Sequence, residues 1–310
     1  MIGQRGGMNQ TFNGAIANVA YYNSALSAAT VLSQYQAGTT GAGSVINLSI
    51  TGSTINTSGA SINTSGTQTY SGAVVIGTAL TATTSNNKVE FNSTVNSTDS
   101  NARGLTVTTG SGNVTFTGAV GGATNGALGA LAINSTGTTT FSAAVTAASV
   151  TTNAGGTTVM NGGSINTTGG QTYNDAVTLG ATTTLASSAS GAINLASTIN
   201  GAYGLTVNTS GITTFGGIVG GTTNLTSITT DAGGSTAING GSITTSGAQI
   251  YNDALTIGAV TTLSASAITT GSTVAAGANN LTLTTDAISI SGAVSGTGAL
   301  VIQPKTSSTS

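Results

Sequence analysis

The chain lacks the residues on which most catalytic and metal chemistry depends. Its 310 residues include no histidine, no cysteine and no tryptophan, and only 3% are charged. Without histidine and cysteine the chain cannot form a serine or cysteine triad with a histidine base, and most zinc sites are excluded. We therefore expect no catalytic residues, no metal site and no cofactor, and we predict that the protein is not an enzyme.

Positive charge is too scarce for polyanionic partners. The basic residues are Arg5, Lys88, Arg103 and Lys305, too few to neutralise a nucleic-acid backbone or to form a polybasic patch on a membrane. No apolar run approaches the roughly 18 residues of a membrane-spanning helix, and no hydrophobic region follows Met1 as it would in a signal peptide. The sequence thus predicts neither nucleic-acid binding nor membrane insertion.

Glycine and β-branched residues are abundant instead. Disordered chains usually carry high net charge and few β-branched residues, whereas this chain has a net charge of −2 and is rich in Val, Ile and Thr. Residues 105–108 and 281–284 alternate apolar and polar side chains, which is typical of half-buried strands. Gly-Gly and Asn-Gly pairs between such stretches favour turns. These features predict an ordered all-β protein.

One stretch occurs three times, starting at residues 61, 164 and 242 and ending at Tyr70, Tyr173 and Tyr251. These tyrosines are 103 (173 − 70) and 78 (251 − 173) residues apart. The longer spacing contains a surplus of roughly 22 residues at positions 120–141, and a stack of coils tolerates one added unit more easily than a sandwich or a closed barrel does. The sequence therefore predicts a right-handed, single-chain parallel β-helix (β-solenoid) over residues 44–303, with roughly 11 to 13 coils.

The aromatic residues recur with these units. Stacked coils place like residues above like at about 4.8 Å. Phe116, Phe141 and Phe215, together with the three tyrosines above, are therefore predicted to be mostly core stacks or markers spaced along the repeats. A platform for a carbohydrate substrate is the alternative.

The carboxylates are the remaining candidates for chemistry: Glu90, Asp99, Asp175, Asp231, Asp253 and Asp286. Asp175 and Asp253 both occupy a Tyr-Asn-Asp-Ala motif. A polysaccharide-degrading β-helix would need a carboxylate cluster. The first copy, however, has Ser71-Gly72 at the corresponding positions, so we interpret Asp175 and Asp253 as turn-forming residues.

Residues 1–43 do not share the repeat. A strand is expected at residues 15–22 and a short helix at residues 28–36, with Ser27 as its N-cap. Residues 12–27, from Phe12 to Ser27, resemble the closing strand of laminin-G-like, concanavalin-type jelly-roll domains. The resemblance implies that residues 1–43 are the C-terminal remnant of such a domain, although Ala28 and Ala29 stand where the family usually has glutamates. An unrelated amphipathic cap on the stack is the alternative.

The repeat region resembles the β-strand repeats of filamentous-haemagglutinin-like and autotransporter-type bacterial surface proteins. The resemblance rests on the Gly-Gly-Ser-Ile turns at Gly162 and Gly240 and on the Gly-Leu-Thr-Val strands at Gly104 and Gly204. It implies a secreted or cell-surface β-helix stalk or adhesin, with a carbohydrate or the surface of a host or neighbouring cell as its partner. The density of threonine, as at residues 138–140 and 182–184, leaves a carbohydrate-binding or ice-binding module as the alternative, and a polysaccharide-degrading enzyme as a third.

The two ends of the stack are expected to differ. The predicted helix at residues 28–36 could cover the first coil, whereas Pro304 and Lys305 offer little protection to the last. We expect residues 304–310 to be frayed. We also expect the chain to self-associate end to end through residues 300–303.

Overall fold

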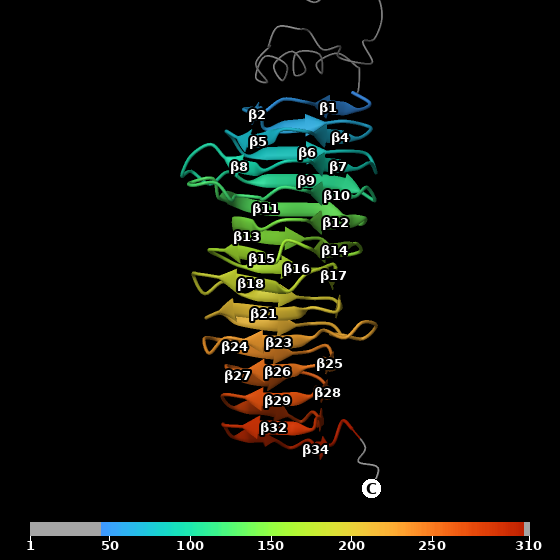
Figure 1. The fold of residues 1–310 in the computed structure, drawn as a ribbon, viewed down its shortest axis with the longest axis vertical. Helices are drawn as coiled ribbons and strands as arrows, with labels where there is room; N and C mark the ends of the chain where they lie inside the picture. Colours follow the sequence, from blue (N-terminus) through green and yellow to red (C-terminus); the bar gives the residue numbers. More distant parts are fainter. Residues whose placement is uncertain (1–44, 307–310) are drawn as a thin grey trace, which may run out of the picture.

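The computed structural model describes residues 45–306, which form a single stack of about 13 β-coils. The coils lie one above another as a rod in Figure 1, and the chain runs from the blue end to the red end. Every strand pairing is parallel, and no helix occurs among the described residues. The predicted all-β solenoid is therefore confirmed. The predicted strand at 15–22, the helix at 28–36 and the jelly-roll remnant at 1–43 lie outside the described residues.

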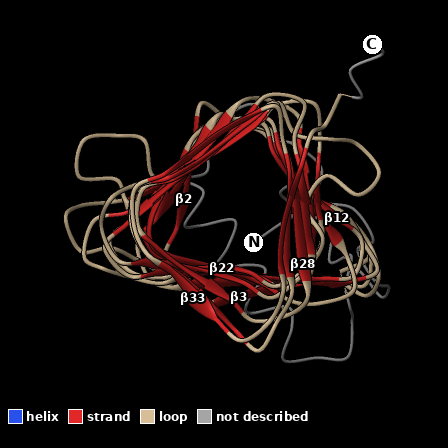
Figure 2. Ribbon diagram, turned by 90° about the horizontal axis from the view of Figure 1, so that it is seen from below, coloured by secondary structure: helices blue, strands red, loops and turns tan. Residues whose placement is uncertain are grey.

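Seen along its axis, the rod has three sides (Figure 2). Each coil contributes to three parallel sheets, which we number in the order in which the chain meets them.

The first sheet contains β1 (Leu48–Ile50), β4 (Gln68–Tyr70), β7 (Val89–Phe91), β10 (Val114–Phe116), β12 (Thr138–Phe141), β14 (Thr157–Met160), β17 (Ala176–Leu179), β20 (Ile199–Asn200), β25 (Ser242–Thr244), β28 (Thr261–Ser264), β31 (Leu281–Thr284) and β34 (Leu300–Gln303). Between β20 and β25 the sheet continues through isolated bridges at Val219.

The second sheet contains β2 (Thr54–Thr57), β5 (Ala73–Ile76), β8 (Val95–Ser97), the first half of β13 (Val145–Thr152), β15 (Ser164–Thr167), β18 (Thr183–Ser187), β21 (Gly204–Thr209), β23 (Ser227–Thr230), β26 (Ala248–Tyr251), β29 (Ala267–Thr270) and β32 (Ala287–Ile290). Bridges from Val120 to Val95 and to Val145 join β8 to β13.

The third sheet contains β3 (Ser61–Asn63), β6 (Leu80–Thr83), β9 (Leu105–Gly110), β11 (Leu128–Ser135), the second half of β13, β16 (Gln171–Tyr173), β19 (Ile193–Leu195), β22 (Ile212–Phe215), β24 (Ser235–Ile238), β27 (Ala254–Ile257), β30 (Val274–Gly277) and β33 (Val294–Gly296).

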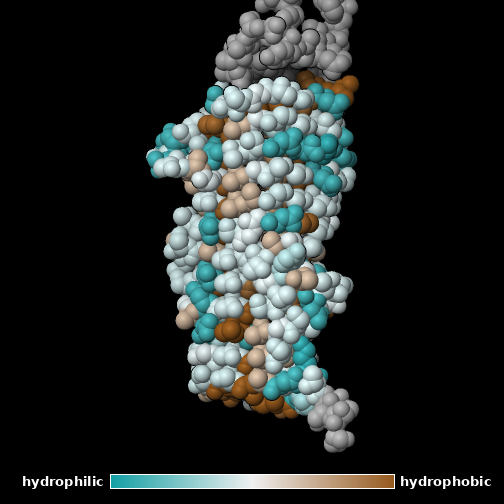
Figure 3. Space-filling model, viewed as in Figure 1, coloured by the Kyte–Doolittle hydropathy of each residue, from teal (hydrophilic) through white to brown (hydrophobic). Residues whose placement is uncertain are grey.

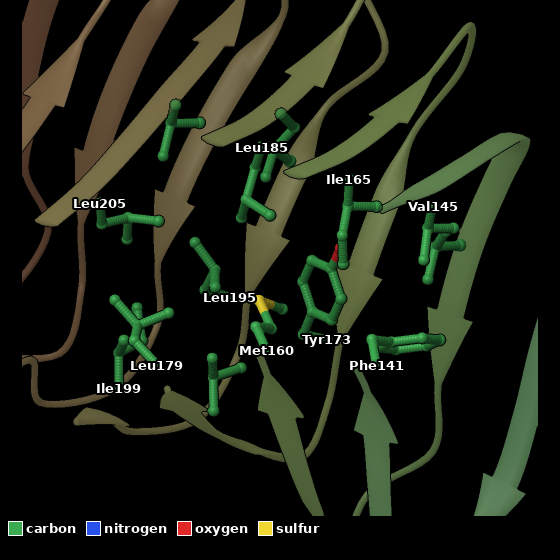
Figure 4. Close-up of a cluster of buried hydrophobic side chains, with 14 of the residues drawn as sticks. Phe141, Val145, Met160, Ile165, Tyr173, Leu179, Leu185, Leu195, Ile199 and Leu205 are labelled. Carbon is green, nitrogen blue, oxygen red and sulfur yellow. The ribbon is translucent and has the colours of Figure 1, made fainter. Parts of the chain in front are cut away.

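The core consists of side chains that point inward from all three sheets. Burial alternates along most strands, as the period of two predicts. Because the strands are parallel and in register, each inward residue lies directly above its counterpart in the next coil. Figure 4 shows part of this core, including Ile165 and Leu185, which are register partners in the second sheet. Burying one such side chain stabilises the fold by about 1.5–3 kcal/mol.

The surplus segment forms one added coil, as predicted. Leu131 of β11 pairs with Leu105 above it and with Val150 below it. In the later copy Leu205 pairs directly with Ile228, with no coil between them. Residues 120–141 therefore lie within a single coil that is paired on both sides.

The predicted aromatic stack exists for only part of the set. Tyr70, Phe91, Phe116 and Phe141 stack face to face in the first sheet, with ring centroids 4.9, 5.0 and 5.3 Å apart. Phe215, however, lies in the third sheet between Leu195 and Ile238. Tyr173 and Tyr251 lie on other sides of the rod, as described below. All six of the predicted rings lie in the core, each at most 1% exposed, and Tyr70, Phe116 and Phe141 among them belong to the stack.

The end of the chain differs in part from the expected frayed tail. The backbone N–H groups of Lys305 and Thr306 both donate to Oδ1 of Asp286, each at 2.9 Å. The Lys305 ammonium donates to the carbonyl of Thr245 at 2.8 Å. These bonds hold residues 305 and 306 against the side of the stack, and residues 307–310 lie outside the described part.

Candidate functional site

The motif that occurs three times builds a corner of the solenoid. In the second copy, Nε2 of Gln171 donates to the carbonyl of Ile165 in its own coil at 3.1 Å and to the carbonyl of Ala186 in the next coil at 2.9 Å. Oε1 of the same side chain accepts from the Tyr173 hydroxyl at 2.8 Å. One buried amide thus closes the turn and ties two coils together.

The other copies repeat this geometry. Gln68 donates to Ile62 and to Thr83 in the next coil, and it accepts from Tyr70. Gln249 donates to Ile243 and to Ser264, and it accepts from Tyr251 at 3.1 Å. This glutamine was not among the residues predicted from the sequence. Its presence two positions before the tyrosine in every copy was the signal that could have identified it.

The three copies lie at three different corners. The first connects β3 to β4, from the third sheet to the first; the second connects β15 to β16, from the second to the third; the last connects β25 to β26, from the first to the second. The motif therefore specifies a local turn between two strands and not a fixed side of the rod. Burial of the tyrosine rings raises the pKa of Tyr173 and Tyr251 far above the usual range.

Asp175 and Asp253 follow two of these corners and point into the stack. Oδ1 of Asp175 accepts from the N–H of Gly156 at 2.8 Å, and Oδ2 accepts from the Thr158 hydroxyl at 3.1 Å. The oxygens of Asp253 accept from the hydroxyls of Thr230 and Thr236, each at 2.9 Å. Both carboxyl groups are buried, and each bonds to residues of the preceding coil. Their predicted place in turns is observed, with a coil-to-coil bond in addition.

Burial is also the main influence on the pKa of these carboxyl groups. Loss of solvation raises the pKa of Asp175 and of Asp253, while hydrogen bonds, from Gly156 to Asp175 and from Thr236 to Asp253, oppose the rise. The charge of Asp231 raises the pKa of Asp253 further. Asp231 and Asp253 lie at the same corner in successive coils, and this proximity was not predicted from the sequence. Their spacing of 22 residues (253 − 231), close to one coil, was the available signal.

The other carboxylates are dispersed over the rod. Glu90 pairs with Lys88 at 2.8 Å, and Asp99 lies 3.9 Å from Arg103. The N–H of Thr306 holds the pKa of Asp286 below its usual range. Within residues 45–306, no group of three His, Cys, Asp or Glu side chains is placed to hold a metal ion. The same residues contain no helix long and apolar enough to cross a membrane.

A groove runs along the corner between the second and third sheets. Its volume is about 630 Å³, and Thr167, Ser187 and Thr209, which are register partners in successive coils, lie along its floor. Their hydroxyls donate to backbone carbonyls, those of Thr167 and Ser187 both to Gly169. Asp231 is the one charged residue in the lining. The groove is therefore nearly neutral, and small apolar side chains such as Ala147 and Ala186 line it beside the hydroxyl groups.

The first sheet carries a regular set of outward hydroxyls near the C-terminal end. Two ranks run through successive coils, and we call them the hydroxyl face: Ser242, Thr262 and Thr282 in one, and Thr244, Ser264 and Thr284 in the other. Strand geometry places the ranks about 7 Å apart and the coils about 4.8 Å apart. No charged residue interrupts these ranks, so this surface can offer repeated hydrogen bonds to a neutral, regular partner.

Comparison with known proteins returns no match: no family model, no curated relative and no solved structure aligns with the chain. The resemblances to filamentous-haemagglutinin-like repeats and to laminin-G-like domains therefore stay predictions.

Proposed function

We propose that the chain is a non-enzymatic stalk segment of a large bacterial cell-surface or secreted protein, of the filamentous-haemagglutinin-like or autotransporter-type kind, and that it serves attachment. The observation that carries the proposal is the continuity of the inward columns, which run through the successive described coils with local register shifts at the ends of β11 and β30. Such a stack is stiff along its axis because each coil is bonded to its neighbours over all three sides.

The chemistry of the side chains agrees with a structural role. The buried carboxylates and the corner glutamines make their hydrogen bonds within the stack, so they support folding. The outer surface is neutral and hydroxyl-rich, which suits a segment that holds an attachment domain away from a cell. The proposed location is extracellular or at the bacterial surface, with a carbohydrate or the surface of another cell as the partner of the whole protein.

Stretching single molecules by their two ends tests the stalk. A stalk should keep its folded length as load increases, up to a sharp threshold, and should then release contour length in steps of about one coil. Gradual lengthening from the lowest loads would contradict the proposal. Incubation with a panel of polysaccharides addresses the enzyme alternative: reducing ends that form with the natural chain and are absent with the Asp175→Asn/Asp253→Asn variant would also contradict it.

A binding module is the second candidate, and the groove favours it. Its lining of small apolar and hydroxyl side chains with a single carboxylate suits an extended neutral polysaccharide. Ser188→Tyr would fill the groove, whereas Ser246→Tyr, at an exposed position that is not part of the groove lining, is the matched control. A binding module predicts glycan binding that is lost in the first variant and kept in the second. For the ice-binding form, thermal hysteresis should disappear with Thr262→Tyr on the hydroxyl face.

A further inference from the structure

Four asparagines in the described part of the chain are followed directly by glycine: Asn125, Asn161, Asn200 and Asn239. Asparagine is a thermolabile residue, because the backbone nitrogen of the next residue can attack Cγ of its side chain. Glycine hinders this attack least, since it has no Cβ atom. The attack needs a side chain that is free to turn and a backbone nitrogen whose N–H is not held in a hydrogen bond. The folded structure therefore decides which of the four pairs can react.

Two of the four pairs lie in turns of identical sequence. Residues 161–165 and residues 239–243 both read Asn-Gly-Gly-Ser-Ile. The first turn joins β14 to β15 and the second joins β24 to β25. Both asparagines are exposed, and the third residues of the turns, Gly163 and Gly241, have φ angles of +73° and +76°. The two asparagines are thus matched in local sequence, exposure and backbone shape.

The two turns differ in one hydrogen bond. The N–H of Gly240 donates to the carbonyl of Phe215 at 3.1 Å. The N–H of Gly162 has no acceptor among residues 45–306. Within the same residues, the side-chain amides of Asn161 and Asn239 make no hydrogen bond. The attacking nitrogen is therefore free at Asn161 and held at Asn239.

The remaining two pairs are held as well. The N–H of Gly126 donates to the carbonyl of Ala123 at 2.9 Å, and the N–H of Gly201 donates to the carbonyl of Thr223 at 3.2 Å. Oδ1 of Asn200 also accepts from two backbone N–H groups, at 2.9 and 3.2 Å, and these bonds fix its side chain. Of the four pairs in the described residues, only the one between β14 and β15 combines a free nitrogen with a free side chain.

We propose that Asn161 is a self-modification site, at which the folded chain converts asparagine into aspartate and isoaspartate. The nitrogen of Gly162 bonds to Cγ of Asn161, its proton passes to Nδ2, and Nδ2 leaves as ammonia. Water then opens the five-membered ring. Cleavage at Cγ gives aspartate, whereas cleavage at the main-chain carbonyl gives isoaspartate, in which the backbone runs through the former side chain. The reaction needs no enzyme, oxidant or reductant, and the proposal does not depend on the stalk function.

The modification changes a nearly neutral rod near its middle. β14 and β15 lie near the middle of the stack in Figure 1, and Figure 3 shows a surface of mostly intermediate hydropathy with scattered hydrophilic patches. The whole chain has four basic and six acidic residues, so one added carboxylate is a large relative change. Isoaspartate also lengthens the backbone where Oδ1 of Asn161 lies over Gly180 of the next coil. We therefore expect it to disturb the register of this coil and to weaken the stack.

Incubation of the 310-residue chain at mildly alkaline pH is the first test, with mass spectrometry of peptic peptides as the measurement. Pepsin works in acid, where the backbone nitrogen keeps its proton and the reaction stops during digestion. In the folded chain we expect conversion at Asn161 to be roughly tenfold faster than at Asn239, because the hydrogen bond of Gly240 must break before attack. In urea both turns unfold, and the two rates should become equal.

Replacement of each asparagine by glutamine is the second test, because glutamine would have to close a less favourable six-membered ring. After incubation the natural chain should unfold at a lower urea concentration than the fresh chain, and Asn161→Gln should keep its midpoint. Asn239→Gln, the matched control in an equally exposed turn, should lose stability as the natural chain does. Equal rates at the two asparagines in the folded chain, a difference that persists in urea, or equal loss of stability in the two variants would overturn the proposal.

Discussion

The upper and lower parts of the rod solve the same packing problem with different materials. In the upper part, residues 70–141, coils of 21 to 25 residues (91 − 70 and 116 − 91) carry a column of stacked aromatic rings in the first sheet. In the lower part, from about Asp175 onward, the same sheet carries aliphatic side chains such as Ile243 and Leu263, which are 20 residues apart (263 − 243). Two buried aspartates, Asp175 and Asp253, lie inside the corners of this part. The common element is the register of the inward columns. Coil length and side-chain type can vary as long as this register is kept.

Removing whole coils from either part should be tolerated, and removing half a coil should not. Deletion of residues 117–141 joins Phe116 to Ser142 in register, and deletion of residues 244–263 does the same for Ile243 and Ser264. Each variant should fold into a rod shorter by about 4.8 Å, measured by small-angle X-ray scattering.

Deletion of residues 117–128 is the control for the whole-coil variants, because it removes one side of a coil only. The strand after it would face a missing corner, so we expect loss of the folded state by circular dichroism. A stable rod from this half-coil variant would show that register is not what unites the two parts.

Gly72, which follows the first copy of the motif, should tolerate an added side chain less well than Gly52 does. The first copy has Gly72 where the second has Asp175, and a Cβ atom at Gly72 would lie 1.8 Å from the carbonyl oxygen of Gly52. Gly72→Ala should therefore cost about 1–3 kcal/mol by overpacking. Gly52→Ala, where the nearest atom would be at 3.7 Å, is the matched control. Urea unfolding measures both, and equal stability of the two variants would refute the explanation.

The aromatic column should contribute more than a single buried ring. Phe116 stacks on Phe91 and Phe141, whereas Phe215 lies between Leu195 and Ile238. Replacement by leucine removes two ring contacts in the first case and none in the second. Because each stacked pair contributes about 0.5–1.5 kcal/mol beyond area burial, Phe116→Leu should destabilise by roughly 1 kcal/mol or more beyond Phe215→Leu. Equal losses in urea unfolding would mean that the stack only fills space.

The buried aspartates should make the lower part sensitive to pH. Burial raises the folded-state pKa of Asp175 and Asp253 above the ordinary value of 3.8, so the folded state binds more protons than the unfolded state between these values. Stability from this source is complete below pH 3.8 and is lost as the pH rises through the folded-state pKa. Asp175→Asn/Asp253→Asn should flatten this decline in urea unfolding. Asp99→Asn, on the exposed surface of the upper part, should leave it unchanged.

Much of this architecture could be predicted from local patterns. The alternation of apolar and polar side chains at residues 105–108 and 281–284 shows which side chains face inward. Their direction depends only on the two-residue period of a strand. The surplus of residues between Leu105 and Val150 identified an added coil, because an insertion that keeps register must be one whole turn of the stack. The turn role of Asp175 followed from its neighbours in the sequence.

The candidate site was less accessible, because it depends on which residues meet across coils. The pairing of Gln171 with the carbonyl of Ala186 joins groups 15 residues apart in two coils, and the proximity of Asp231 to Asp253 depends on a shared corner. The groove floor likewise brings Thr167, Ser187 and Thr209 into line only when the coils are stacked. Coil lengths vary, so the sequence spacing alone does not show which positions coincide.

The sequence by itself determined that the chain is a β-solenoid and where its repeated motif lies. Only the tertiary structure decided that the three copies turn three different corners and that Asp175 and Asp253 point inward. The physical reason is that the motif fixes a local bend through Gln171 and its counterparts, whereas the side of the rod on which it falls depends on the number of residues in every coil between copies. Exposure of Ile302 similarly depends on the absence of a coil below it among the described residues, and not on its own strand.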